Sequence, residues 1–276
     1  MVSAINRIFA LAWLTVLDGL RSHALLGLVF LSISAQAGGL LFFDFISRDV
    51  GRASSDFIFS ISWFSGFLFL FFHAVKVVAW DEDRNVIYNL LARPISRAEY
   101  VLGIFFGLAL LMLFLNLLLG SLGWLTLVWI KSNVTPEYFG HLSPGFYLLS
   151  WAGLFAMELM MLSVILLFSG LIRGSFPVLL ISISFYAICS GMPVVRESFS
   201  QQAVSDTGSH VSARLLQIMT AVFPDFSRLD FKNLLMSSAQ IWPDLTTLLV
   251  NFGLTVGYIT LSLWFACAVY NRRDLQ

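Results

Sequence analysis

The sequence predicts an all-α, polytopic membrane protein with six transmembrane helices, and two observations support this. The 276 residues are 58% hydrophobic and only 12% charged, whereas soluble domains carry about 25% charged residues. The apolar residues also form several long runs, close to the roughly 20 residues that a helix needs to cross a bilayer. This composition excludes a soluble enzyme, and a net charge of zero gives no reason to expect a nucleic-acid partner.

Six segments between charged residues are long and apolar enough to form the spans of a single transmembrane domain, 1–276. The predicted spans are residues 22–43, 57–78, 101–129, 146–171, 175–195 and 245–270. These runs are too long for the strands of a membrane barrel. An even number of spans places both termini on one side. Arginine and lysine are more frequent in the segments on that side, so the positive-inside rule predicts cytoplasmic termini.

The first twenty residues, 1–20, are predicted to form an interfacial helix. Its apolar residues recur at helical spacing: Ile5, Ile8, Phe9, Ala12, Trp13, Val16, Leu17 and Leu20. A helix with one apolar face of this kind lies in the membrane interface. We expect it to turn into the first span near residues 19–21; a cytoplasmic extension of the first span is the alternative.

Residues 81–97, between the second and third spans, are predicted to form a short cytoplasmic helix. Three acidic residues, 81–83, stand where they complement the positive end of a helix dipole, and Pro94 ends the helix. Ser96 and Glu99 have the spacing of a capping box that starts the third span. A separately capped helix between two spans is suited to docking a cytosolic protein; a capped hairpin without a partner is the alternative.

The connection before the last span, 196–244, is predicted to be an outer loop with amphipathic helices over 211–235. The apolar residues of this segment are too many for a free loop and too few to cross the bilayer. A break is expected at Pro224 and Asp225. The resulting helix–break–helix would lie at the outer surface or dip into it.

No catalytic or metal-binding motif is found in the sequence. None of the lysines follows a glycine, so the phosphate-binding Gly-x-x-x-x-Gly-Lys-Ser/Thr pattern is missing from the chain. Glu158 is the one acidic residue deep in a span, and such residues usually mark a substrate or ion path. The alternative is a protonated Glu158 that hydrogen-bonds a neighbouring helix through Asn116 or a serine.

Two further patterns lie within the predicted spans. Phe59, Trp63, Phe67 and Phe71 form an aromatic ladder at helical spacing, and Trp63, Phe67 and Glu158 are candidate substrate-path residues. Ordinary packing or a lipid-facing stripe is the alternative for the ladder. Gly103 and Gly107 form a Gly-x-x-x-Gly pattern, which permits close approach of another helix.

The order of these parts, together with three stretches, resembles the type-2 exporter family of ATP-binding-cassette permeases. Residues 15–22 are similar to the family's entry into span one. Residues 84–103, centred on 87–97, resemble its coupling-helix signature, a leucine-rich turn before Arg-Pro-Ile-Ser-Arg. The outer stretch Phe223–Asp230 is similar to members of the subfamily that includes permeases serving the maturation of copper enzymes. The lead into the coupling helix, residues 84–88, departs from the family's usual pattern.

The resemblance implies a permease subunit of a bacterial cytoplasmic (inner) membrane, surrounded by lipid. It would dimerise with a second copy of itself and recruit a separately encoded ATPase subunit that holds ATP and magnesium, so no cofactor is expected in this chain. The residues expected to contact that ATPase are Asp83, Arg84, Tyr88, Leu90, Leu91 and Arg93. The outer segment could bind an extracytoplasmic partner, and neither the substrate nor the direction of transport follows from the residues.

Two other function classes remain open from the residues alone. A proton- or ion-coupled secondary transporter would use Glu158, although such carriers usually contain inverted repeats that this sequence does not show. A non-transporting assembly subunit would use the 81–99 hairpin only to hold a cytosolic partner.

Overall fold

The computed structural model describes residues 4–40, 50–78, 96–134, 142–204, 223–235 and 242–272. Within these ranges 92% of the residues are helical and none is in a strand, so the predicted all-α class is confirmed. The elements are α1 (Ala4–Arg21), α2 (His23–Leu40), α3 (Val50–Leu68), η2 (Phe69–Ala74), α6 (Arg97–Asn133), α7 (Pro144–Leu171), α8 (Ser175–Val204), η3 (Phe226–Leu229), α10 (Lys232–Leu235) and α11 (Leu245–Arg272).

Five helices in the described part of the chain are long and apolar enough to cross a membrane. They are Val50–Val78, Arg97–Asn133, Pro144–Leu171, Ser175–Val195 and Leu245–Arg272. The predicted first span coincides with α2, which meets the criterion only together with α1, as one span bent by 62°. The count is therefore five, or six with the bent pair, where the sequence predicted six.

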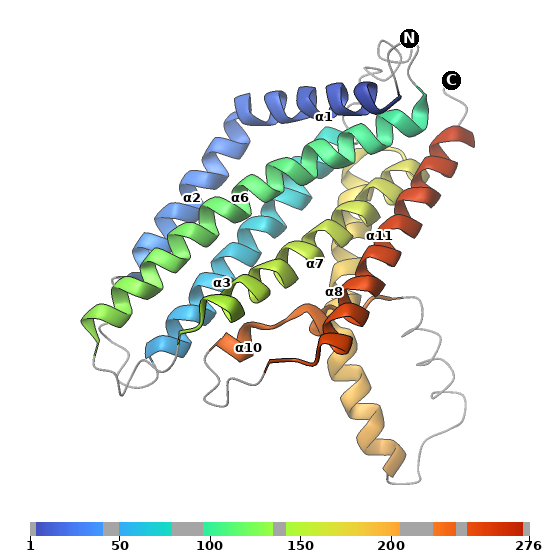
Figure 1. The fold of residues 1–276 in the computed structure, drawn as a ribbon. Coiled ribbons are helices and arrows are strands. Elements are labelled where there is room, and N and C mark those ends of the chain that lie inside the picture. The colour runs from blue at the N-terminus through green and yellow to red at the C-terminus, as the bar shows by residue number, and fades with distance from the viewer. Residues whose placement is uncertain are drawn as a thin grey trace.

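The helices form an elongated bundle whose two ends differ (Figure 1). The first turns of α1, the start of α6 and the end of α11 lie together at one end, here called the terminal end. The starts of α3 and α7 lie at the opposite end, called the far end, together with α10. The most apolar stretches of α3, α6 and α7 are more than half buried within the bundle, whereas those of α8 and α11 are only 22% buried. Helices α3, α6 and α7 therefore make the core.

Helix α1 packs lengthwise on α6, a contact that the sequence did not predict. Arg7 contacts Glu99, and glycines on one helix face side chains on the other at three further positions. These three pairs are Leu11 with Gly103, Thr15 with Gly107, and Gly19 with Leu111. From one contact to the next, the position advances by four residues in α1 and by four in α6. The two helices therefore run parallel over three turns.

The opposite face of α1 leaves large apolar side chains exposed, among them Ile5, Phe9 and Trp13. These side chains belong to the apolar face from which an interfacial helix was predicted. The position of this helix at a membrane surface stays a prediction. The helix ends near the expected position: Ser22 caps α2 by accepting a hydrogen bond from the Leu25 amide, 3.2 Å away. That cap fits the change of direction between α1 and α2.

Helix α8 continues beyond its predicted end. The sequence placed an outer loop from residue 196 onwards, but the helix extends to Val204 and passes the other helices at the far end (Figure 1). Residues 196–204 contain neither glycine nor proline and include good helix formers such as Arg196 and Glu197. Loss of hydrophobicity marks where a span can end, but it does not by itself end a helix.

The described part of the predicted 211–235 segment contains short turns where the sequence predicted a helix after the break. Asp225 caps the four-residue η3 by accepting a hydrogen bond from the Ser227 amide at 3.1 Å, and α10 is one further turn. Four apolar side chains of this stretch are buried: Phe226, Leu229, Phe231 and Leu235. The stretch therefore packs into the bundle at the far end, while residues 211–222 lie outside the described ranges.

Candidate functional site

The start of α6 is bonded to two other helices at the terminal end. Ser96 caps α6 through the predicted capping box: its Oγ accepts from the Glu99 amide at 3.2 Å, and Glu99 Oε2 accepts from the Ser96 amide at 2.9 Å. The second carboxylate oxygen, Oε1, lies 2.6 Å from Nη2 of Arg7 in α1. One carboxylate thus caps α6 and holds α1.

Arg97 makes the corresponding bond to the last helix. Its Nη1 donates to the carbonyl oxygens of Tyr270 and Asn271, at 3.0 and 3.2 Å. A guanidinium is favourable here because the last carbonyls of a helix have no partner within the helix and carry partial negative charge. We call Arg7, Ser96, Arg97, Glu99 and the end of α11 the helix junction.

The predicted coupling segment joins the bundle at this junction. The chain leaves the α3 span at Val78 and re-enters described structure at Ser96. Of residues 81–97, only the last two are described. The six candidate contact residues, Asp83, Arg84, Tyr88, Leu90, Leu91 and Arg93, lie outside the described residues.

We expect Arg7→Ala to lower the thermal unfolding midpoint of the purified protein by a few degrees, because it leaves the largely buried Glu99 carboxylate without its cation. Glu99→Gln should lower it as well. The two together should cost less than the sum of the single changes, since both remove the same contact. Arg21→Ala, an exposed arginine at the other end of α1, is the control. Strictly additive losses would mean that the two side chains do not interact.

Glu158 lies where α3, α6 and α7 meet. The residue is 3% exposed, and its Oε2 accepts a hydrogen bond from Asn116 Nδ2 of α6 at 2.6 Å. The other oxygen, Oε1, lies against Gly66 of α3 and accepts no hydrogen bond from the described residues. This hydrogen bond to Asn116 is the one predicted as the structural alternative to a place in a substrate or ion path. It uses one of the two carboxyl oxygens, so Oε1 is available for a second role.

The aromatic ladder of α3 forms a column beside Glu158. Trp63 and Phe67 have ring centroids 5.4 Å apart, and Phe67 and Phe71 are 4.2 Å apart. Tyr186 of α8 contacts the first two of these rings, at 5.5 and 4.9 Å. Phe59, the fourth member of the predicted ladder, instead contacts Tyr147 and Trp151 of α7. The helix winds as the π-helix η2 over Phe69–Ala74, a form often found at functional sites.

The structure therefore brings Trp63, Phe67 and Glu158 together. They line a narrow space of about 10 Å³, which Tyr186 and Met157 also line. The sequence missed Tyr186 as a candidate. A signal existed in the spacing, because Tyr186 lies four residues from both Ser182 and Ser190 and so shares a polar helix face with them.

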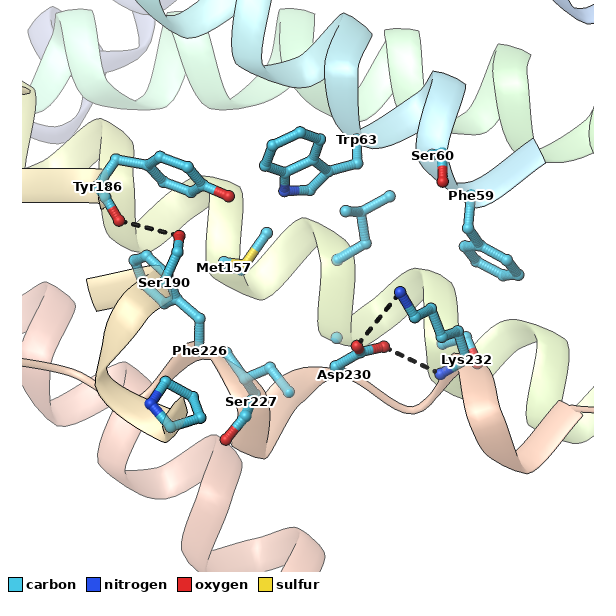
Figure 2. Close-up of a pocket in the computed structure, with 15 residues that line it drawn as sticks. Phe59, Ser60, Trp63, Met157, Tyr186, Ser190, Phe226, Ser227, Asp230 and Lys232 are labelled. Atoms are coloured by element: carbon cyan, nitrogen blue, oxygen red, sulfur yellow. Dashed lines mark hydrogen bonds and ion pairs between the residues drawn. The ribbon is translucent and has the colours of Figure 1, made fainter. Parts of the chain in front are cut away.

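A larger cavity of about 400 Å³ lies on the far-end side of this column (Figure 2). Four segments line it: α3, α7, α8 and the stretch 226–232. Trp63, Met157 and Tyr186 line both the cavity and the narrow space, so these three side chains separate the cavity from Glu158. At the other side Asp230 and Lys232 form an ion pair at 3.6 Å. The cavity thus combines an aromatic wall with a charged rim.

No family model matches the chain, and no curated protein matches it. The helix junction and the cavity are therefore the features that bear on function. In the ranges that the structure describes, no group of three or more histidine, cysteine, aspartate or glutamate side chains could hold a metal ion. What the described residues offer is binding in an amphipathic cavity and mechanical connection between helices.

Proposed function

We propose that this chain is the transmembrane permease subunit of an ATP-binding-cassette exporter. In this proposal two copies form the substrate path in a bacterial cytoplasmic membrane, and a separate ATPase subunit with ATP and magnesium drives them. The observation that carries it is the helix junction, because the segment that resembles a coupling helix ends at Ser96 and Arg97, where α6 is bonded to α1 and α11.

The junction gives a force on residues 81–97 a direct route into the bundle. The capping box joins Ser96 rigidly to the first turn of α6. The Glu99 carboxylate passes the movement to Arg7 and so to α1, while Arg97 passes it to the end of α11. Packed helices move as rigid bodies between discrete arrangements, so one push at this point shifts three helices together.

The remaining parts are compatible with this function. Five to six helices of membrane-spanning length suit a transporter component. The cavity and the aromatic column are the part that each copy would contribute to the path, from the far end towards Glu158. With both termini in the cytoplasm, the far end would face outward and could hold an extracytoplasmic partner.

The test is to co-express the chain with its genomic neighbours, purify it and measure the ATPase activity that co-purifies. We expect a stoichiometric ATPase, and we expect it to be lost in the double variant Arg84→Glu with Leu91→Asp, which reverses charge and removes bulk in the coupling segment. The matched control, Lys131→Glu with Leu245→Asp, makes the same changes at two exposed residues at the far end and should keep the partner.

If no ATPase co-purifies and the double variant keeps every partner, the permease proposal fails. A partner whose ATP turnover changes no conformation of this chain would instead favour the assembly subunit. A proton- or ion-coupled secondary transporter is the other candidate. The buried Glu158 favours it, because one of its oxygens accepts no hydrogen bond from the residues that the structure describes. Proton-dependent uptake that Glu158→Gln abolishes would establish that carrier.

A further inference from the structure

We propose that the cavity of Figure 2 is a binding site for an organic cation with an apolar body, such as an aryl-substituted ammonium or phosphonium ion. The proposal rests on the proposed function only for the claim that this ion is cargo. Binding itself depends on this chain alone. Three properties of the cavity support it: the aromatic wall, the balance of charge and the size.

The lining of the cavity is largely aromatic, and its rings come from three segments. Trp63 of α3 and Tyr186 of α8 contact each other at 5.5 Å, and Phe226 stacks on Tyr186 at 5.8 Å (Figure 2). The faces of such rings attract cations, and tryptophan does so best. The attraction is larger in a site shielded from water, and Phe226 is itself buried. Met157 completes the wall with a polarisable sulfur.

Charge around the cavity favours a cation over an anion. Asp230 and Lys232 neutralise each other at the rim, in a pair whose side chains are both more than 40% exposed. Behind Trp63, Met157 and Tyr186 lies Glu158, and among the described residues that line the two spaces Lys232 is the one basic residue. A cation in the cavity would favour the ionised form of Glu158, and the two spaces would then carry an acidic excess. A buried carboxyl oxygen without a hydrogen-bond partner costs free energy, and a nearby cation offsets that cost.

The size and polarity of the cavity limit the ligand further. A volume of about 400 Å³ lies within the range of small-molecule sites, roughly 300–1,000 Å³. Four serines interrupt the apolar wall, and three of them already donate hydrogen bonds elsewhere. Ser150 Oγ donates to the Phe146 carbonyl oxygen at 2.8 Å, Ser190 Oγ to the Tyr186 carbonyl oxygen at 2.9 Å, and Ser227 Oγ to Asp225 Oδ1 at 2.6 Å. Few polar groups are thus left for a strongly hydrated ligand. The cavity suits a bulky ion whose charge is spread over an apolar body.

The test is equilibrium binding of radiolabelled tetraphenylphosphonium to the purified full-length protein in lipid nanodiscs. Empty nanodiscs of the same lipid give the background, and tetraphenylborate is an anion of the same shape. We expect saturable binding that tetraphenylborate does not displace. Trp63→Leu should weaken binding about tenfold, as expected when one desolvated cation–π contact is lost. Trp63→Phe should restore most of the affinity, because the ring remains.

Two further variants protect the result against misfolding. Trp264→Leu makes the same change at a tryptophan of α11 that is 64% exposed, and it should bind as the parent protein does. Glu158→Gln keeps the shape of the side chain and its bond to Asn116, and it should weaken binding several-fold by removing the acidic excess. Equal binding of the borate, or tetraphenylphosphonium affinity unchanged in both Trp63→Leu and Glu158→Gln, would overturn the proposal.

The outcome separates this inference from the proposed function. Saturable cation binding without a co-purifying ATPase would leave the site in place and remove the permease. An ATPase that co-purifies with a chain that binds no tetraphenylphosphonium would keep the permease and remove the cation site.

Discussion

Gly107→Val should separate α1 from α6. A Cβ atom on Gly107 would lie 2.8 Å from the Ala12 carbonyl oxygen and 2.6 Å from the Thr15 Cβ. Neither of those atoms can turn aside, because one is backbone and the other is fixed to it. The helices must therefore move apart, and we expect a loss of about 1–3 kcal/mol in stability, as for other overpacked contacts.

The separation of α1 can be measured directly. Spin labels at Ala10 and Phe106, both exposed, should report a longer and broader distance distribution in Gly107→Val than in the parent protein. The control is Gly257→Val on α11, the same substitution at a helical glycine whose added Cβ would have no described atom within 4 Å. An unchanged distance in Gly107→Val would mean that α1 is not docked on α6 as described. Under the proposed function, the variant should also uncouple ATP hydrolysis from movement of α1.

This contact shows what the sequence can and cannot predict about packing. The Gly-x-x-x-Gly pattern at Gly103 and Gly107 indicated a close approach of some helix, and the structure contains one. The pattern could not name the partner, because small residues make room for any neighbour. That partner is α1, whose apolar residues are divided between a face on α6 and an exposed face with Phe9 and Trp13. Periodicity predicts an apolar face, but it does not distinguish burial in protein from burial in lipid.

The helices themselves were predictable because each depends on local sequence. Long apolar runs need internally bonded backbone in a membrane, and the Ser96–Glu99 capping box needs only a spacing of three residues. The predicted span over 175–195 agrees with the apolar stretch Ser175–Val195, but the loop predicted directly after it is wrong, because the helix continues to Val204. Loss of hydrophobicity predicts the end of a span and not the end of its helix.

The cavity was less predictable because its lining comes from four separate segments. Trp63 and Phe67 were candidates through their spacing on one helix, and Glu158 was one through its charge in a span. Tyr186 and the Asp230–Lys232 rim join them only through tertiary packing. The short stretch 223–235 is decisive here, because it closes one side of the cavity. The sequence predicted an amphipathic segment that lies at the outer surface or dips into it, and this pattern does not indicate a cavity wall.

Gly153→Val tests that closure, and we expect it to displace the stretch around Leu229 from α7. A Cβ on Gly153 would overlap the Leu229 carbonyl oxygen and would lie 3.0 Å from the Phe231 ring. A backbone carbonyl cannot rotate away without moving its segment, so the wall of the cavity must shift. We expect a stability loss of about 1–3 kcal/mol and loss of saturable tetraphenylphosphonium binding.

The control for this variant is Gly253→Val on α11, where an added Cβ would meet no atom of the described residues within 4 Å, and binding should be unchanged. If Gly153→Val loses stability but still binds the cation, the ligand does not need the 226–232 wall, and the aromatic column beside Glu158 must hold it alone. If binding is lost in Gly153→Val and in Trp63→Leu but not in the two controls, both walls are needed. Since one wall is part of the α3 span and the other is a far-end segment, movement of α3 against that segment would then open or close the site.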